Sequence, residues 1–215
     1  MPLLNIQIDP CESAIPRLVA KTIADAWETI QAFQTQTRNN PVKGFHPSDF
    51  EGAYQWLVGL KKQFSQNAIP RFCEWGSGFG VTSYLAQSLG YEATAIESDP
   101  KLFQAAQRWQ NRIGASFTHL NGSFIPPSFL EKHQSITAFN PTPTLWLNLN
   151  VESRSESNRL DSHEFDLVYA YPWPGEEEFI FELFDVVSKP GALLLTFHGA
   201  ADFRLHQKTI AKPFS

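Results

Sequence analysis

Residues 71–80 read RFCEWGSGFG, a short apolar run that ends in the carboxylate of Glu74 and leads into glycines at 76, 78 and 80. The sequence that follows is typical of a helix start. A buried strand that turns into a helix through glycines brings bare backbone N–H groups close to a ligand. We therefore expect a ligand-binding turn between a strand and a helix at this position.

The carboxylate of Glu74 narrows the class of ligand. It would repel a pyrophosphate, whereas a cationic or hydroxyl-bearing ligand would be accepted beside it. The dinucleotide-binding pattern G-x-G-x-x-G also fails, because Val81 stands where the third glycine would fall. A nucleotide-dependent oxidoreductase is thus disfavoured, and it is kept as the second alternative.

Strands and helices alternate from residue 71 onward. Apolar runs predict strands at 72–74, 93–97, 116–120, 165–170 and 192–197. Helical patterns lie between them, at 81–89, 99–113, 126–133 and 174–188. This alternation predicts an α/β fold with a doubly wound, mostly parallel sheet of five strands. Residues 203–209 alternate in polarity and predict a further, antiparallel edge strand.

The first 70 residues show helical patterns without a glycine cluster. Apolar residues recur at helical spacing between Ile15 and Phe33, which predicts an amphipathic helix of about five turns. Ser48 and Glu51 are spaced as a capping box and predict the start of a second helix, with Ser48 as its N-cap.

These patterns divide the chain into two parts. We expect a helical N-terminal extension at 1–70, packed on the core as a lid, and a ligand-binding domain at 71–215. Residues 134–164 are rich in Asn, Ser, Thr and Pro, so we expect an insertion there, with some strand character near 144–151 and a mobile tip near 152–162.

Composition excludes several classes of protein. Lys and Arg number 17 against 22 Asp and Glu, so the charge gives no reason to expect a nucleic-acid partner. No apolar run is long enough to span a bilayer, and no metal-ligand spacing is present. The two cysteines, Cys11 and Cys73, are not expected to pair, because Cys73 lies in a buried strand. We expect a cytoplasmic protein without a metal, and the oligomeric state is left open.

The chain resembles the class I S-adenosyl-L-methionine (SAM)-dependent methyltransferases, whose first motif has the pattern found here at Glu74-x-Gly76-x-Gly78-x-Gly80. The resemblance extends from residue 71 to about residue 198. Glu97 closes the next strand, 21 residues after Gly76, where that family holds the ribose hydroxyls with an acidic side chain. The resemblance implies a Rossmann-like fold and SAM as the cofactor.

The resemblance also implies roles for particular residues. Glu74 would lie near the methionine amino group, and Gly76 and Gly78 would let the cofactor lie against the main chain. Asn121 to Phe124 occupy the place of the adenine-contacting motif, although Ser123 stands where an aspartate is usual. The full set of expected cofactor-binding residues is Glu74, Gly76, Ser77, Gly78, Gly80, Glu97, Ser98, Ser123, Phe124 and Tyr169. The alternative is structural: the glycines serve packing, Glu74 caps the next helix, and Glu97 is a solvated strand end.

The loop after the fourth strand reads Tyr171-Pro172-Trp173-Pro174 and faces the methyl group by the same resemblance. It lacks the Asp or Asn that base-methylating relatives carry there, so methylation of a nucleic-acid base is disfavoured. Its rings would form a cage for a cationic or planar acceptor, or would simply rigidify the loop. Candidate general bases are Tyr171, Glu176 and His198, and for His198 a turn-capping role is the alternative.

The sequence thus predicts a SAM-dependent methyltransferase that acts on a small-molecule or protein acceptor. The first alternative is a non-catalytic SAM-binding or scaffold protein of the same fold, because no obvious catalytic residue follows the fourth strand.

Overall fold

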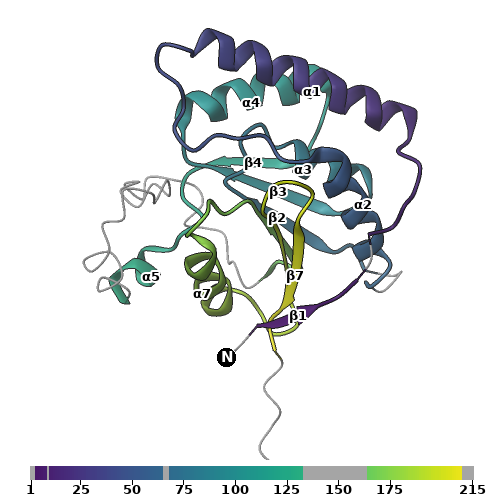
Figure 1. Ribbon diagram of the computed structural model, residues 1–215, viewed down its shortest axis with the longest axis vertical. Coiled ribbons are helices and arrows are strands. Elements are labelled where there is room, and N and C mark those ends of the chain that lie inside the picture. The colour runs from purple at the N-terminus through teal and green to yellow at the C-terminus, as the bar shows by residue number, and fades with distance from the viewer. Residues whose placement is uncertain (1–2, 9, 65–67, 133–163, 210–215) are drawn as a thin grey trace, which may run out of the picture.

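The computed structural model describes residues 3–8, 10–64, 68–132 and 164–209. Within these residues the strands form one seven-stranded sheet in the order β1-β7-β6-β5-β2-β3-β4 (Figure 1). The strands are β1 (Leu4–Ile6), β2 (Arg71–Trp75), β3 (Glu92–Glu97), β4 (Thr118–Asn121), β5 (Leu167–Ala170), β6 (Leu193–Phe197) and β7 (Phe203–Gln207). The helices are α1 (Arg17–Gln36), α2 (Phe50–Lys61), α3 (Val81–Ser88), α4 (Pro100–Ile113), α5 (Pro127–Lys132) and α7 (Glu177–Val187).

The predicted parallel core of five strands is confirmed. β2 pairs in parallel with β3 and with β5, β3 pairs with β4, and β5 pairs with β6. The strand order reverses between β2 and β5, so the loops that follow them leave to opposite faces of the sheet. In open α/β sheets, ligands bind in the crevice that this reversal leaves at the carboxyl ends of the strands.

The antiparallel strand after β6 is also confirmed, but the prediction that it forms the edge of the sheet is wrong. β7 pairs with β6 on one side and with β1 on the other, where Leu4 lies opposite Gln207. β1 belongs to the segment that the sequence predicts to be helical. Three residues are too few to show the alternation that marks a strand, so the sequence gives no signal for β1.

Helices cover both faces of the sheet. α1, α2, α3 and α4 lie on one side, and α5 and α7 lie on the other (Figure 1). Each face of the sheet packs on its own hydrophobic core. Successive side chains of a strand point to opposite faces, so alternate residues lie in one core or the other. Phe72 and Tyr169 pack in the core under α1 to α4, whereas their neighbours Cys73 and Val168 pack in the core with α7.

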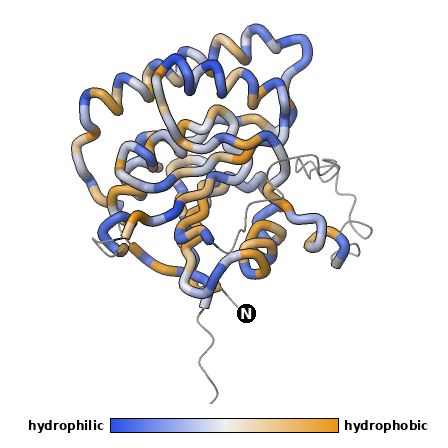
Figure 2. Tube along the Cα trace, turned by 180° about the vertical axis from the view of Figure 1, so that it is seen from behind, coloured by the Kyte–Doolittle hydropathy of each residue, from blue (hydrophilic) through white to orange (hydrophobic). Residues whose placement is uncertain are grey.

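Helix α1 lies across α3 and α4 and is tied to α4 through Asp25. The Asp25 carboxylate accepts hydrogen bonds from the indole N–H of Trp109 at 2.9 Å and from the Arg112 guanidinium at 2.9 Å. Hydrophobic and hydrophilic residues alternate along this helix (Figure 2), and its buried face carries Val19, Ile23, Ala26 and Ile30. The position of α1 fixes where the loop to α2 begins.

Helix α2 begins one residue later than the capping box predicts. Its N-cap is Asp49, whose carboxylate accepts a hydrogen bond from the Gly52 N–H at 2.9 Å. The predicted cap, Ser48, is buried and forms a short hydrogen bond with the Tyr169 hydroxyl on β5. Two adjacent residues with capping side chains compete for this position, and the long-range contact with Tyr169 decides between them.

The predicted insertion at 134–164 lies, apart from Glu164, outside the described residues. Over the residues that are described, no helix is long and apolar enough to cross a membrane.

Candidate functional site

A cavity of about 660 Å³ lies at the carboxyl ends of β2, β3 and β5, where the strand order reverses. Its volume is in the range of small-molecule sites, roughly 300–1,000 Å³. It brings together most of the residues that the sequence singles out: Glu74, Gly76, Ser77, Gly78, Glu97, Ser98, Ser123, Phe124, Tyr169, Tyr171 and Glu176. Gly80 and His198 are not among the lining residues.

The glycine turn between β2 and α3 needs its glycines for backbone conformation. Gly76, Gly78 and Gly80 have φ of +68°, +56° and +70°, which side chains disfavour. A Cβ on Gly78 would lie 2.7 Å from the Phe45 ring, and one on Gly80 would lie 2.9 Å from the Phe117 ring. At Gly78 and Gly80, aromatic side chains of the protein itself therefore pack closely against the backbone. This agrees with the structural alternative, in which the glycines serve packing.

Glu74 caps helix α3 from the end of β2. Its carboxylate accepts hydrogen bonds from the Ser83 N–H at 2.9 Å and from the Ser83 hydroxyl at 2.7 Å. Burial raises the pKa of Glu74 to about 7, although the bonds from Ser83 oppose this shift. Glu74 thus has the capping role of the structural alternative, and it lines the cavity at the same time.

Glu97 is buried at the end of β3 and holds two backbone segments. One carboxylate oxygen accepts a hydrogen bond from the Gly78 N–H at 2.8 Å, and the other accepts one from the Asp99 N–H at 2.8 Å. Burial raises the pKa of Glu97 to about 7, against the effect of these backbone donors. A carboxylate has about four lone-pair positions, so Glu97 keeps acceptor capacity toward the cavity. It is not the solvated strand end of the structural alternative, because it is only 6% exposed.

The loop after β4 forms the next part of the wall. The Ser123 hydroxyl accepts a hydrogen bond from the Ile125 N–H at 3.1 Å, and the Asn121 amide donates to the Glu97 carbonyl at 2.8 Å. The Phe124 ring is stacked on Trp75, with centroids 5.1 Å apart and planes 5° apart. This stack fixes a flat aromatic surface at the edge of the cavity.

Ser77, in the glycine turn, contacts a buried histidine. Its hydroxyl lies 3.2 Å from Nε2 of His119, the residue in the middle of β4. Burial lowers the pKa of His119 to about 4, so this imidazole is neutral near pH 7. The contact joins the turn after β2 to β4 without adding a charge to the cavity.

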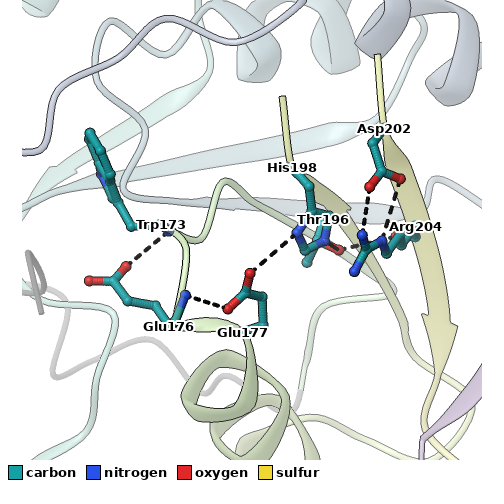
Figure 3. A network of polar contacts seen from close by, with 8 residues as sticks. Trp173, Glu176, Glu177, Thr196, His198, Asp202 and Arg204 are labelled. Atoms are coloured by element: carbon teal, nitrogen blue, oxygen red, sulfur yellow. Dashed lines mark hydrogen bonds and ion pairs between the residues drawn. The ribbon is translucent and has the colours of Figure 1, made fainter. Parts of the chain in front are cut away.

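The loop after β5 supplies two of the three candidate bases to the cavity. Tyr171 lines it, and Glu176 lines it although the Glu176 side chain is 2% exposed. The Glu176 carboxylate accepts a hydrogen bond from the Trp173 backbone N–H at 3.1 Å (Figure 3). This bond folds the loop back on the start of α7 and holds the carboxylate beside Trp173.

His198, the third candidate base, follows β6 and belongs to a polar network with Thr196 and Glu177. Its Nε2 is 2.8 Å from the Thr196 hydroxyl, and its Nδ1 is 3.9 Å from a carboxylate oxygen of Glu177 (Figure 3). Glu177 also accepts a hydrogen bond from the Gly175 N–H at 2.7 Å. His198 therefore contacts the residue that anchors the loop.

Further residues, which no motif in the sequence indicates, reach the cavity from the segment between α1 and α2. Phe45 and Lys43 line it, and so does Lys101, at the start of α4. The Asp99-Pro100 helix start was a usable signal for Lys101, because it places the first turn of α4 beside the end of β3. Phe45 follows no motif, and its place depends on contacts that are distant in sequence.

The described residues include no group of three or more His, Cys, Asp or Glu able to hold a metal ion.

Comparison with known proteins identifies the fold. No protein-family model matches the sequence, and no curated protein does. The structure is similar to an RNA methyltransferase from Salinibacter ruber in complex with S-adenosyl-L-homocysteine (SAH), with a TM-score of 0.50 and 13% identity, covering 79% of this chain and 98% of that one. It is also similar to a protein from Corynebacterium glutamicum, with a TM-score of 0.53 and 11% identity, covering 94% of each chain. The fold is thus the Rossmann-like α/β fold of SAM-dependent methyltransferases.

Proposed function

We propose that this chain binds SAM in the cavity and transfers its methyl group to an acceptor. The observation that carries the proposal is Glu97, a buried carboxylate at the carboxyl end of β3 that is bonded to the glycine turn and faces the cavity. A carboxylate at this place accepts hydrogen bonds from the two ribose hydroxyls, and such charge-assisted bonds are strong.

The remaining cofactor contacts follow from the lining of the cavity. Ser98, Ser123 and the stacked ring of Phe124 flank the end of β3, where the adenine would lie. Glu74 and the glycine turn lie at the end of β2, on the side of the methionine moiety. The carboxylates of Glu74 and Glu97 favour a cofactor that carries positive charge.

SAM supplies a sulfonium-bound methyl group, and its transfer to a nucleophile requires mainly alignment of the reacting atoms at about 3–3.5 Å. This chain contributes a wall that excludes water and orients the acceptor, built from the loop after β5. A general base is needed only when the acceptor must lose a proton, and Glu176 and Tyr171 are placed for that role.

The acceptor is proposed to be a small molecule or a protein, and RNA is kept as a third candidate. The similar Salinibacter ruber protein is an RNA methyltransferase by its name, so this fold serves RNA as well. The expectation of no nucleic-acid partner rests on the acidic net charge of this chain and on the missing Asp or Asn in the loop after β5, and neither excludes a local contact with RNA.

A label-transfer experiment tests the proposed activity. The protein is incubated with SAM labelled in its methyl group and with a cell extract, which is then separated into small molecules, proteins and RNA. We expect label in one of these fractions, and loss of that label when Glu97 is changed to Ala. SAM that binds without any transfer of label would contradict the enzyme and support the non-catalytic SAM-binding alternative.

A further inference from the structure

One short segment touches both ends of the cavity. Residues 40–48, here called the strap, connect α1 to α2, and all of them line the cavity. The strap has a turn in its middle, where the Phe45 N–H donates to the Val42 carbonyl at 3.4 Å and Gly44 has a φ of +74°.

At the cofactor end, the strap rests on the glycine turn through Phe45. A Cβ on Gly78 would lie only 2.7 Å from a carbon of this ring, so the ring packs directly against the Gly78 backbone. It also packs on Phe79, with centroids 5.9 Å apart, and on Phe33 of α1, at 6.3 Å.

At the acceptor end, the strap holds Trp173. The indole N–H of Trp173 donates to the Gly44 carbonyl at 3.1 Å. The His46 ring meets the Trp173 ring edge-on, with centroids 4.9 Å apart and planes at 77°. The last residue of the strap, Ser48, is hydrogen-bonded to Tyr169 at the end of β5.

We propose that the strap couples the two ends of the cavity, so that the acceptor wall is complete only while Phe45 is seated on the glycine turn. Phe45 lies between Gly44 and His46, and neighbouring Cα atoms are only about 3.8 Å apart, so a shift of the strap backbone that carries Phe45 away from Gly78 also displaces the two residues that contact Trp173. A cofactor that favours the seated strap therefore also orders Trp173, which makes the binding order cofactor first and acceptor second. The binding order rests on the proposed function, whereas the coupling itself does not.

Hydrogen exchange of the ligand-free protein tests the coupling directly. In Phe45→Ala, we expect faster exchange at the Trp173 and Gly175 amides, which lie outside the substituted segment. In Trp173→Phe, which keeps a ring but removes the donor to Gly44, we expect faster exchange at the Phe45 amide. Loss of one such hydrogen bond predicts a change of roughly twofold to tenfold.

Trp56→Phe is the matched control, because Trp56 packs on Phe203 and does not line the cavity. We expect unchanged exchange at both segments in this variant. Faster exchange within the strap of Phe45→Ala, with residues 171–176 unaffected, would overturn the proposal. The same holds for Trp173→Phe if the strap is unaffected there, so the conclusion does not depend on one variant.

Addition of SAH extends the test to the binding order. In the wild type, saturating SAH should slow exchange in the strap and in residues 171–176 together. In Trp173→Phe, it should slow exchange in the strap while residues 171–176 lose most of that protection. Equal protection of both segments in the variant would overturn the binding order. Absence of protection anywhere would contradict the proposed function and leave the ligand-free coupling to stand or fall on its own result.

Discussion

The Glu97 carboxylate accepts a hydrogen bond from the Gly78 N–H at 2.8 Å, so the end of β3 is bonded directly to the turn after β2. Its other oxygen is bonded to the Asp99 N–H, at the start of α4. One buried side chain therefore holds two walls of the cavity in position before a ligand binds. Such preorganisation favours binding, because the ordering cost is met on folding.

The raised pKa of Glu97 predicts a pH-dependent stability. The folded protein keeps this proton up to about pH 7, whereas the unfolded chain loses it near the ordinary glutamate pKa of 4.5. The stabilisation is therefore complete below about pH 4.5 and is lost as the pH rises through about 7. Glu97→Gln removes the titration of this group. Relative to the wild type, we therefore expect the variant to be more stable at about pH 8.5 than at about pH 5, that is, to have the higher relative free energy of unfolding there. Urea unfolding measures the free energy of unfolding of both proteins at each pH. If the variant and the wild type differed by the same amount at the two pH values, the raised pKa of Glu97 would be refuted.

The contact between Gly78 and Phe45 predicts a position-specific cost. Gly78→Ala places a side chain at positive φ, which costs about 1–2 kcal/mol, and adds the overlap with the Phe45 ring. Gly191→Ala is the matched control, because Gly191 also has a positive φ, +84°, but no atom lies within 4 Å of its added Cβ. We expect Gly78→Ala to be the more destabilising variant in thermal unfolding. Phe45→Ala in the Gly78→Ala background should remove the excess, and independent effects would contradict the packing.

Two alanines in the turn between β6 and β7 predict stabilising substitutions. Ala200 and Ala201 have φ of +48° and +61°, which is costly for a residue with a Cβ. We expect Ala200→Gly and Ala201→Gly each to raise the free energy of unfolding by about 0.5–1 kcal/mol. Ala20→Gly, at an exposed position inside α1, should lower it by about 1 kcal/mol. A loss of stability at both turn positions would show that the turn is not strained.

The core of the fold and the position of Glu97 could be predicted from the sequence because both depend on local patterns. Apolar runs between helical segments mark parallel strands, and Glu97 follows such a run at a fixed distance from Gly76. The same logic could not find β1, which has three residues, or decide between Ser48 and Asp49 as the N-cap. In both cases the outcome depends on a partner that is distant in sequence, Gln207 or Tyr169.

The role of the glycines shows the limit of motif-based reasoning. The motif predicts a turn between a strand and a helix, and the structure has this turn, with positive φ at Gly76, Gly78 and Gly80. The motif does not say what lies against them, and at Gly78 that is Phe45, from a segment with no recognisable pattern. The contacts of the strap could therefore not be predicted from the sequence, and a lid formed by residues 1–70 stays a prediction.

Calorimetric titration with SAH tests the central claim most directly. The account predicts that SAH binds the wild type and Glu92→Gln, an exposed position at the other end of β3, with similar affinity. At about pH 8.5, where Glu97 is ionised, it predicts that Glu97→Gln binds at least about tenfold more weakly, because a charge-assisted hydrogen bond is lost. NAD should give no heat, and SAH at about a hundred times its Kd should stabilise the wild type by about 2.7 kcal/mol. The absence of both heat and stabilisation with SAH would contradict the account.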